Sequence, residues 1–140
     1  MSERFLVPTD FSADADQALQ YAMVLGTALG AHLIVLHVRD DTALNPLAYS
    51  AQAEAATRQV LERLLEPVYA AGLTGEIVFI HGVPWREICH LAHERQATLI
   101  VMGTHGRTGL SHLLLGSVTE NVVRHASCPV LVTRDSKVAS

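Results

Sequence analysis

The sequence predicts a three-layer α/β fold, in which a doubly wound sheet of five parallel strands lies between layers of four helices. Short apolar segments alternate with longer segments of helical periodicity, and the chain ends with a further strand-like segment. The strand-like segments are apolar on both faces, which is typical of a parallel sheet covered on both sides. We take the strand order 3-2-1-4-5 from doubly wound folds of this length.

The first strand and helix are expected near the N-terminus. Residues 4–10 form a short apolar run that ends in Pro and Asp. Ser12 is the expected N-cap of the next helix, and Gly30 its expected end. The buried face of that helix is expected to hold Ala15, Leu19, Ala22, Met23 and Gly26. Residues 32–38, apolar and rich in β-branched side chains, predict the second strand.

A mixed polar loop is expected after the second strand, followed by a long helix over residues 51–71 that Gly72 ends. Pro67 lies inside this helix, where proline can introduce a kink. One broad apolar face is formed by Val60, Leu61, Leu64, Leu65 and Val68. The remaining strands and helices are expected at residues 76–82, 83–97, 98–103, 118–125 and 128–134.

Composition limits the classes of function. The 140 residues are 49% hydrophobic and 17% charged, which suits a single globular domain over residues 1–140. The net charge is −4 and no long basic block occurs, so a nucleic-acid partner is not expected. No apolar run approaches the ~18 residues of a membrane span, and no signal peptide is evident, so we expect no membrane partner and a cytoplasmic location. Cys89 and Cys128 are expected to be reduced and mostly buried.

Three loops with suggestive residues leave the carboxyl ends of predicted strands. They contain "PTDFS" after the first strand, "VRDD" after the second and "GTHGRTG" after the fourth. In an open parallel sheet, ligands bind outside these ends, at the point where the strand order reverses. With the assumed order, the first and fourth strands flank that point.

The glycine-rich segment after the fourth strand indicates an anion site. Gly103 and Gly106 are expected to let the backbone approach a ligand and to adopt positive φ. Ser117 and Glu120 have the spacing of a capping box, which predicts a helix start at Ser117 whose free N–H groups suit phosphate. Ser117 and Thr119 add hydroxyl donors. The alternative is that the box only starts a helix and the glycines only turn the chain.

Two common phosphate motifs are excluded. The Walker A motif needs a lysine in its loop, and the only lysine of the chain is Lys137. The dinucleotide fingerprint Gly-x-Gly-x-x-Gly does not occur in the sequence.

The segment "MGTHGRTGLSHLLLGSVTENVVRHASCPVLV" resembles the signature of the universal stress protein family. Its spacing, Gly103-x2-Gly106-x9-Gly116-Ser117, is that of the ATP-binding branch. "PTDFS" and "HLIVLHV" also resemble family segments, so the likeness covers nearly the whole chain. The resemblance implies one universal stress protein domain over residues 1–140, with an adenine nucleotide alpha hydrolase-like fold, ATP as ligand and a homodimer.

The resemblance also assigns roles by position. Asp10 would accept hydrogen bonds from ribose hydroxyls, Pro8 and Thr9 would shape that wall, Val38 would contact adenine and Met102 would pack near the base. The phosphates would lie against Gly103, His105, Gly106 and Arg107 on one side, and against Gly116, Ser117, Val118 and Thr119 on the other. The dimer would form through the last strand, at Val130, Leu131 and Val132, where a bare edge invites pairing unless a helix or the C-terminal tail covers it.

Purely structural roles remain open as alternatives for single residues. Asp10 could cap the first helix, although Ser12 competes for that position, and Arg107 could be a solvated charge. Cys89 and His93 have the spacing of a ligand pair, but no third and fourth ligand follows, so a structural metal is not expected. A metal would instead be Mg²⁺ or Mn²⁺ bridging the phosphates.

The function predicted from these observations is an ATP-binding regulatory protein of the stress response. His105 and Asp10 are the candidates for a catalytic base, but neither belongs to a recognisable Ser–His–Asp, Gly-x-Ser-x-Gly or His-x-x-x-His arrangement, so catalysis is not expected beyond slow ATP hydrolysis. The alternatives are a slow ATPase or phosphotransferase and a nucleotide-free dimeric interaction module.

Overall fold

The computed structural model describes residues 2–40, 50–105 and 115–134, which form five strands and four helices. The elements are β1 (Arg4–Pro8), α1 (Ala13–Leu29), β2 (His32–Asp40), α2 (Ala51–Ala70), β3 (Thr74–Gly82), α3 (Pro84–Glu94), β4 (Leu99–Gly103), α4 (Ser117–His125) and β5 (Val130–Thr133). All strand pairs are parallel and the sheet order is β3-β2-β1-β4-β5. The predicted fold class and strand order are confirmed.

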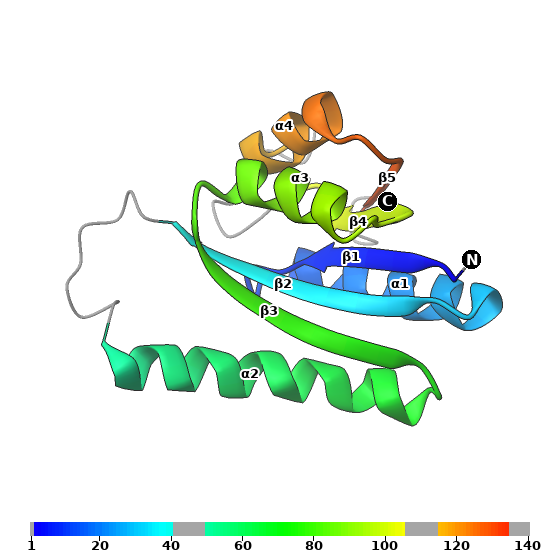
Figure 1. Cartoon of the computed structure of the whole chain (residues 1–140), viewed down its shortest axis with the longest axis horizontal. Helices are drawn as coiled ribbons and strands as arrows, with labels where there is room; N and C mark the ends of the chain where they lie inside the picture. Colours follow the sequence, from blue (N-terminus) through cyan, green and yellow to red (C-terminus); the bar gives the residue numbers. More distant parts are fainter. Residues whose placement is uncertain (1, 41–49, 106–114, 135–140) are drawn as a thin grey trace.

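The sheet has two covered faces, each with its own apolar core. Helices α1 and α2 lie on one face, and α3 and α4 on the other (Figure 1). Successive side chains of β1 alternate between the cores: Phe5 and Val7 pack toward α1 and α2, and Leu6 packs toward α3. None of the described helices is long and apolar enough to cross a membrane.

Local signals fix the ends of α1 largely as predicted. The Ser12 hydroxyl accepts a hydrogen bond from the amide of Ala15, and Gly30 ends the helix with a φ of 67°. The buried face consists of Ala15, Ala18, Leu19, Ala22 and Gly26. Met23, predicted to be buried, is half-buried at the edge of this face.

Helix α2 shows one missed signal and one wrong prediction. Its N-cap is Ser50, whose hydroxyl accepts a hydrogen bond from the amide of Ala53. The predicted apolar face is buried at Leu61, Leu65 and Val68, and Leu64 packs against it. Val60 is 41% exposed, because one step along a helix turns a side chain by about 100° away from its neighbour.

The two central strands separate before they end. β1 pairs with β4 at only two positions, Phe5 with Leu99 and Leu6 with Ile100, whereas it stays paired with β2 through Pro8 and Leu36. Thr9 donates its N–H to Leu36 of β2, so the neighbouring residue Pro8 faces β4. Proline has no N–H to offer there. The strand ends therefore diverge at the switch point.

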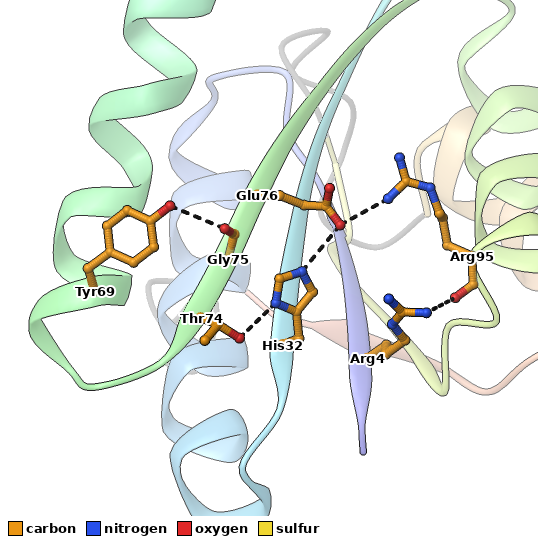
Figure 2. Close-up of polar contacts among 7 residues, drawn as sticks. All are labelled: Arg4, His32, Tyr69, Thr74, Gly75, Glu76 and Arg95. Atoms are coloured by element: carbon orange, nitrogen blue, oxygen red, sulfur yellow. Dashed lines mark hydrogen bonds and ion pairs between the residues drawn. The ribbon is translucent and has the colours of Figure 1, made fainter. Parts of the chain in front are cut away.

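A polar network joins strands and loops at the opposite, amino-terminal edge of the sheet (Figure 2). His32 lies 2.7 Å from the Thr74 hydroxyl and 3.2 Å from a carboxylate oxygen of Glu76. Arg95 donates to the same oxygen over 2.9 Å, and Arg4 donates to the backbone carbonyl of Arg95. Burial would raise the pKa of Glu76, but the hydrogen bonds from His32 and Arg95 outweigh it and hold that pKa below its usual value.

We predict that Glu76→Gln lowers the free energy of unfolding at pH 7 by about 0.5–1 kcal/mol, the range of a partly exposed ion pair. Because the pKa of Glu76 is depressed in the folded state, its contribution is complete above pH 4.5 and is lost as the pH falls through the folded value. Urea unfolding of parent and variant between pH 3 and 7 measures this difference.

The matched control for that prediction is Glu94→Gln, since Glu94 pairs with His90 of its own helix and its side chain is 59% exposed. We expect this control to change stability by less than the Glu76 variant. A Glu76 variant with the same pH profile as the parent would show that the network contributes nothing to stability.

Candidate functional site

A cavity of about 680 Å³ lies at the carboxyl ends of the diverging strands. It is lined by Pro8, Thr9, Asp10, Val38, Met102, Gly103, His105, Gly116, Ser117, Val118 and Thr119, together with residues that the sequence did not single out. Gly106 and Arg107, also predicted for this site, lie outside the described residues. The sequence therefore located residues from three separate loops that the fold brings together.

Sequence reasoning missed part of the cavity wall. Pro84 and Ile88 enter from the first turns of α3, and His37 and Arg39 enter from β2. The helix after β3 also begins at the carboxyl edge of the sheet, so the signal was present in the topology. It was overlooked because the segment "VPWREI" carries no obvious ligand-binding side chain next to the strand end.

The turn between β1 and α1 holds Asp10 at the cavity. Phe11 has a φ of 65°, unusual for a residue other than glycine, and its amide donates to the Thr9 hydroxyl over 3.0 Å. One oxygen of the Asp10 carboxylate accepts the amide of Ser12, also over 3.0 Å. Because Ser12 is the N-cap of α1, Asp10 does not cap that helix.

Gly103 is required by packing within the protein, not by positive φ. The described glycines with positive φ are Gly30, Gly72 and Gly82, so the expectation of positive φ at Gly103 is wrong. A Cβ atom at Gly103 would lie 2.9 Å from the Cβ of Asp14 and 3.0 Å from its carbonyl oxygen. The missing side chain therefore allows the first turn of α1 to approach the end of β4.

Asp14 also fixes the chain that leaves β4. Its carboxylate accepts the amide of His105 over 3.1 Å, and the Thr104 hydroxyl lies at 3.5 Å from the same oxygen. The His105 side chain, 9% exposed, lies beside it, with Nδ1 at 3.8 Å from that oxygen. His105 thus lines the cavity while packed against α1.

Helix α4 begins at Ser117, as predicted, but without the predicted capping box. Its N-cap is Gly116, in an extended conformation with a φ of −64°, and no side chain caps the helix. The predicted capping box at Ser117 is therefore wrong, because the helix starts one residue earlier than the box requires. Glu120 instead pairs with Arg124, four residues along the same helix, at 3.0 Å.

The first turn of α4 is pinned to the end of β4. The amide of Gly116 donates to the carbonyl of Thr104, and the Thr119 hydroxyl donates to the carbonyl of Gly103, both over 2.8 Å. The expectation that Thr119 offers a hydroxyl donor to a ligand is therefore wrong. Within the described residues, the amides of Ser117, Val118 and Thr119 meet no acceptor.

The other kinds of site to consider among the described residues are a metal site and a reactive thiol. Among residues 2–40, 50–105 and 115–134, no three His, Cys, Asp or Glu side chains form a group that could hold a metal ion. Cys89 and Cys128 are free thiols, half-buried and not mostly buried as predicted. Burial raises the pKa of both thiols, which disfavours the reactive thiolate.

The fold and site define a doubly wound α/β protein with a ligand-sized cavity at its switch point. The chain belongs to the universal stress protein family, whose family model matches residues 1–134. This finding agrees with the resemblance carried by the glycine-rich segment.

Individual relatives match over nearly the whole chain. Universal stress protein MJ0577 of Methanocaldococcus jannaschii is 30% identical over an alignment of 157 residues, covering 96% of both chains. The solved structure of MJ0577 superposes with a TM-score of 0.87, covering 97% of this chain and 98% of that one. UspA from Lactobacillus plantarum superposes with a TM-score of 0.82 at 28% identity, covering 94% and 97%.

Some solved relatives are described with a ligand. A universal stress protein in complex with cAMP superposes with a TM-score of 0.73 at 27% identity, covering 94% of this chain and 96% of that one. The architecture shared with these structures is the adenine nucleotide alpha hydrolase-like fold, as the resemblance implied.

We predict that Gly103→Ala destabilises the protein by about 1–3 kcal/mol in the absence of any ligand, because the new methyl group meets the backbone of Asp14. Thermal or urea unfolding measures the loss. The control is Gly26→Ala in α1, where the nearest atom is a methyl group of Leu33 at 3.2 Å that can give way. Equal stability of the Gly103 variant and the parent would contradict the close approach of α1 and β4.

Proposed function

We propose that the protein binds an adenine nucleotide, ATP, in the switch-point cavity and acts as a nucleotide-dependent regulator in the stress response. This proposal rests on one observation: the Asp10 carboxylate lies on one wall of the cavity, and on the other wall lie the first amides of α4, which meet no acceptor among the described residues. A relative that is solved in complex with cAMP supports the same class of ligand.

The phosphates are proposed to lie at the start of α4. The amides of Ser117, Val118 and Thr119 face no acceptor in the described part of the chain, and a helix start carries partial positive charge. The bonds from Gly116 to Thr104 and from Thr119 to Gly103 hold these amides in place before a ligand arrives. Such preorganisation lowers the entropic cost of binding an anion.

The base is proposed to lie beside Val38 and Met102. The carbonyl of Leu36 accepts the amide of Thr9 and therefore points toward β1. Backbone polar groups two residues apart in a strand point to the same side, so those of Val38 also point toward the β1 side. The chain of β1 has already turned into α1 at that level, which leaves the backbone groups of Val38 directed toward the cavity. Met102 and Ile88 add an apolar surface suited to the faces of a purine.

The ribose is proposed to lie between these two ends, with its hydroxyls donating to Asp10. A charged acceptor strengthens such hydrogen bonds, and the Asx turn at Ser12 fixes the carboxylate. Mg²⁺ or Mn²⁺ is proposed to arrive with the phosphates, since Mg²⁺ commonly binds through substrate phosphates and water.

We predict that the two ends of the site can be separated by substitution. Asp10→Asn is expected to weaken binding of ATP and adenosine alike by about 10–100-fold, because both carry the ribose hydroxyls and lose a charged acceptor. Gly116→Val is expected to weaken ATP by about 10-fold or more and adenosine by less than about 3-fold, since its side chain would obstruct the phosphates alone. Titration calorimetry of both ligands measures these changes.

Asp16→Asn is the matched control, because Asp16 is an exposed carboxylate in the first turn of α1 and does not line the cavity. Its affinity for both ligands should equal that of the parent. If the parent protein binds no adenine nucleotide at micromolar concentrations, the proposed function is wrong. If Gly116→Val weakens adenosine as much as ATP, the placement of the phosphates is wrong.

We also propose that two copies pair through β5. This strand is at the sheet edge, and Val130, Leu131 and Val132 are only half-buried. A groove of about 260 Å³ beside it is lined partly by Tyr21 of α1, which is 54% exposed. An unpaired edge flanked by apolar side chains favours pairing with a second strand.

A proline at Val132 tests this dimer. Pro129 accepts the amide of Ile100 in β4, so residue 132 directs its backbone to the open edge, and Val132→Pro removes a donor without breaking the inner ladder. Light scattering should give about twice 15.1 kDa for the parent and for Val132→Thr, and 15.1 kDa for Val132→Pro. A parent mass of one chain would contradict the dimer.

A further inference from the structure

His37 contacts the turn that carries Asp10 on both sides of that residue. Its Nδ1 lies 2.8 Å from the carbonyl oxygen of Thr9. Because a carbonyl only accepts hydrogen bonds, Nδ1 carries the proton and donates it. The His37 ring also packs against the ring of Phe11, with 4.6 Å between centroids. One side chain therefore touches the residue before Asp10 and the residue after it.

The turn needs such support. The positive φ of Phe11 costs free energy for an L-residue with a bulky side chain, so this conformation persists only where its surroundings enforce it. The amide of Thr9 is held by Leu36 and its hydroxyl by Phe11. The hydrogen bond from His37 engages the remaining polar group of Thr9, its carbonyl.

The His37 ring is itself held in a row of rings along β2 and β3. The ring centroids of Phe79 and His37 lie 5.5 Å apart, and His81 stacks on Phe79 with the same distance between centroids. His81 is anchored to Glu54 of α2 over 2.9 Å, and the Arg39 guanidinium lies over Phe79. The His37 ring therefore has a fixed orientation relative to the sheet.

We propose that His37 is a positioning residue for nucleotide binding: it holds the Thr9–Phe11 turn so that the Asp10 carboxylate meets the ribose hydroxyls. This inference rests on the proposed function. His37 acts through the turn, by donating to Thr9 and by packing on Phe11. Its effect is therefore expected to depend on whether the ligand has ribose hydroxyls.

The test compares ATP with 2′,3′-dideoxy-ATP by titration calorimetry. His37→Phe keeps an aromatic ring but removes the donor, and it should weaken ATP by about 10-fold and dideoxy-ATP by less than 2-fold. His37→Asn keeps a donor at a similar distance from the backbone, and it should retain the parent's preference for ATP over dideoxy-ATP within about 3-fold. A general packing defect would weaken both ligands equally.

His81→Phe is the matched control, since His81 belongs to the same row of rings but does not line the cavity. It should leave the ratio of the two affinities unchanged. The proposal is overturned if His37→Phe weakens both ligands equally or neither, or if His37→Asn loses the preference for ATP. If His37→Phe fails to fold, His37→Leu, which also removes the donor, takes its place with the same expected and contradicting results. A parent protein that binds neither ligand would instead overturn the proposed function.

Discussion

The early separation of β1 from β4 is the constraint on which the candidate site depends. Pairing between these strands ends at Leu6 and Ile100, while β1 remains paired with β2 as far as Pro8. Since Pro8 has no N–H to give toward β4, the ladder lacks a donor where the strands diverge. The cavity opens at this divergence, and its walls come from the chain segments that leave the two strand ends.

Helix α1 couples these two walls. The turn that carries Asp10 leads directly into its N-cap, Ser12. Two residues later, in the first turn of the helix, Asp14 meets the backbone of Gly103 without an intervening side chain and accepts the amide of His105. A displacement of the first turn of α1 would therefore move both the carboxylate wall and the exit of β4, which in turn anchors the start of α4 through Gly103 and Thr119.

The sequence predicted the fold and the loops that meet at the cavity, because hydrophobic periodicity and turn residues are local signals. It failed where the decisive partner is distant. The spacing of Ser117 and Glu120 suited a capping box, yet the N-cap is the preceding residue, Gly116, whose amide bonds to the distant carbonyl of Thr104. The sequence does not single out His37, since nothing in its own strand reveals that the carbonyl of Thr9, 28 residues away, is its acceptor.

The two edges of the sheet differ in how their polar groups are satisfied, and this difference bears on the kind of ligand. At the amino-terminal edge, His32, Glu76 and Arg95 satisfy one another. At the carboxyl-terminal edge, the first amides of α4 lack acceptors within the described chain and stand beside apolar side chains. In such a setting, a hydrogen bond from these donors to an anionic acceptor favours binding, and so does covering the apolar wall with a flat apolar group. A simple anion would satisfy only the amides and leave Ile88 and Met102 uncovered, whereas the proposed nucleotide would satisfy both walls at once.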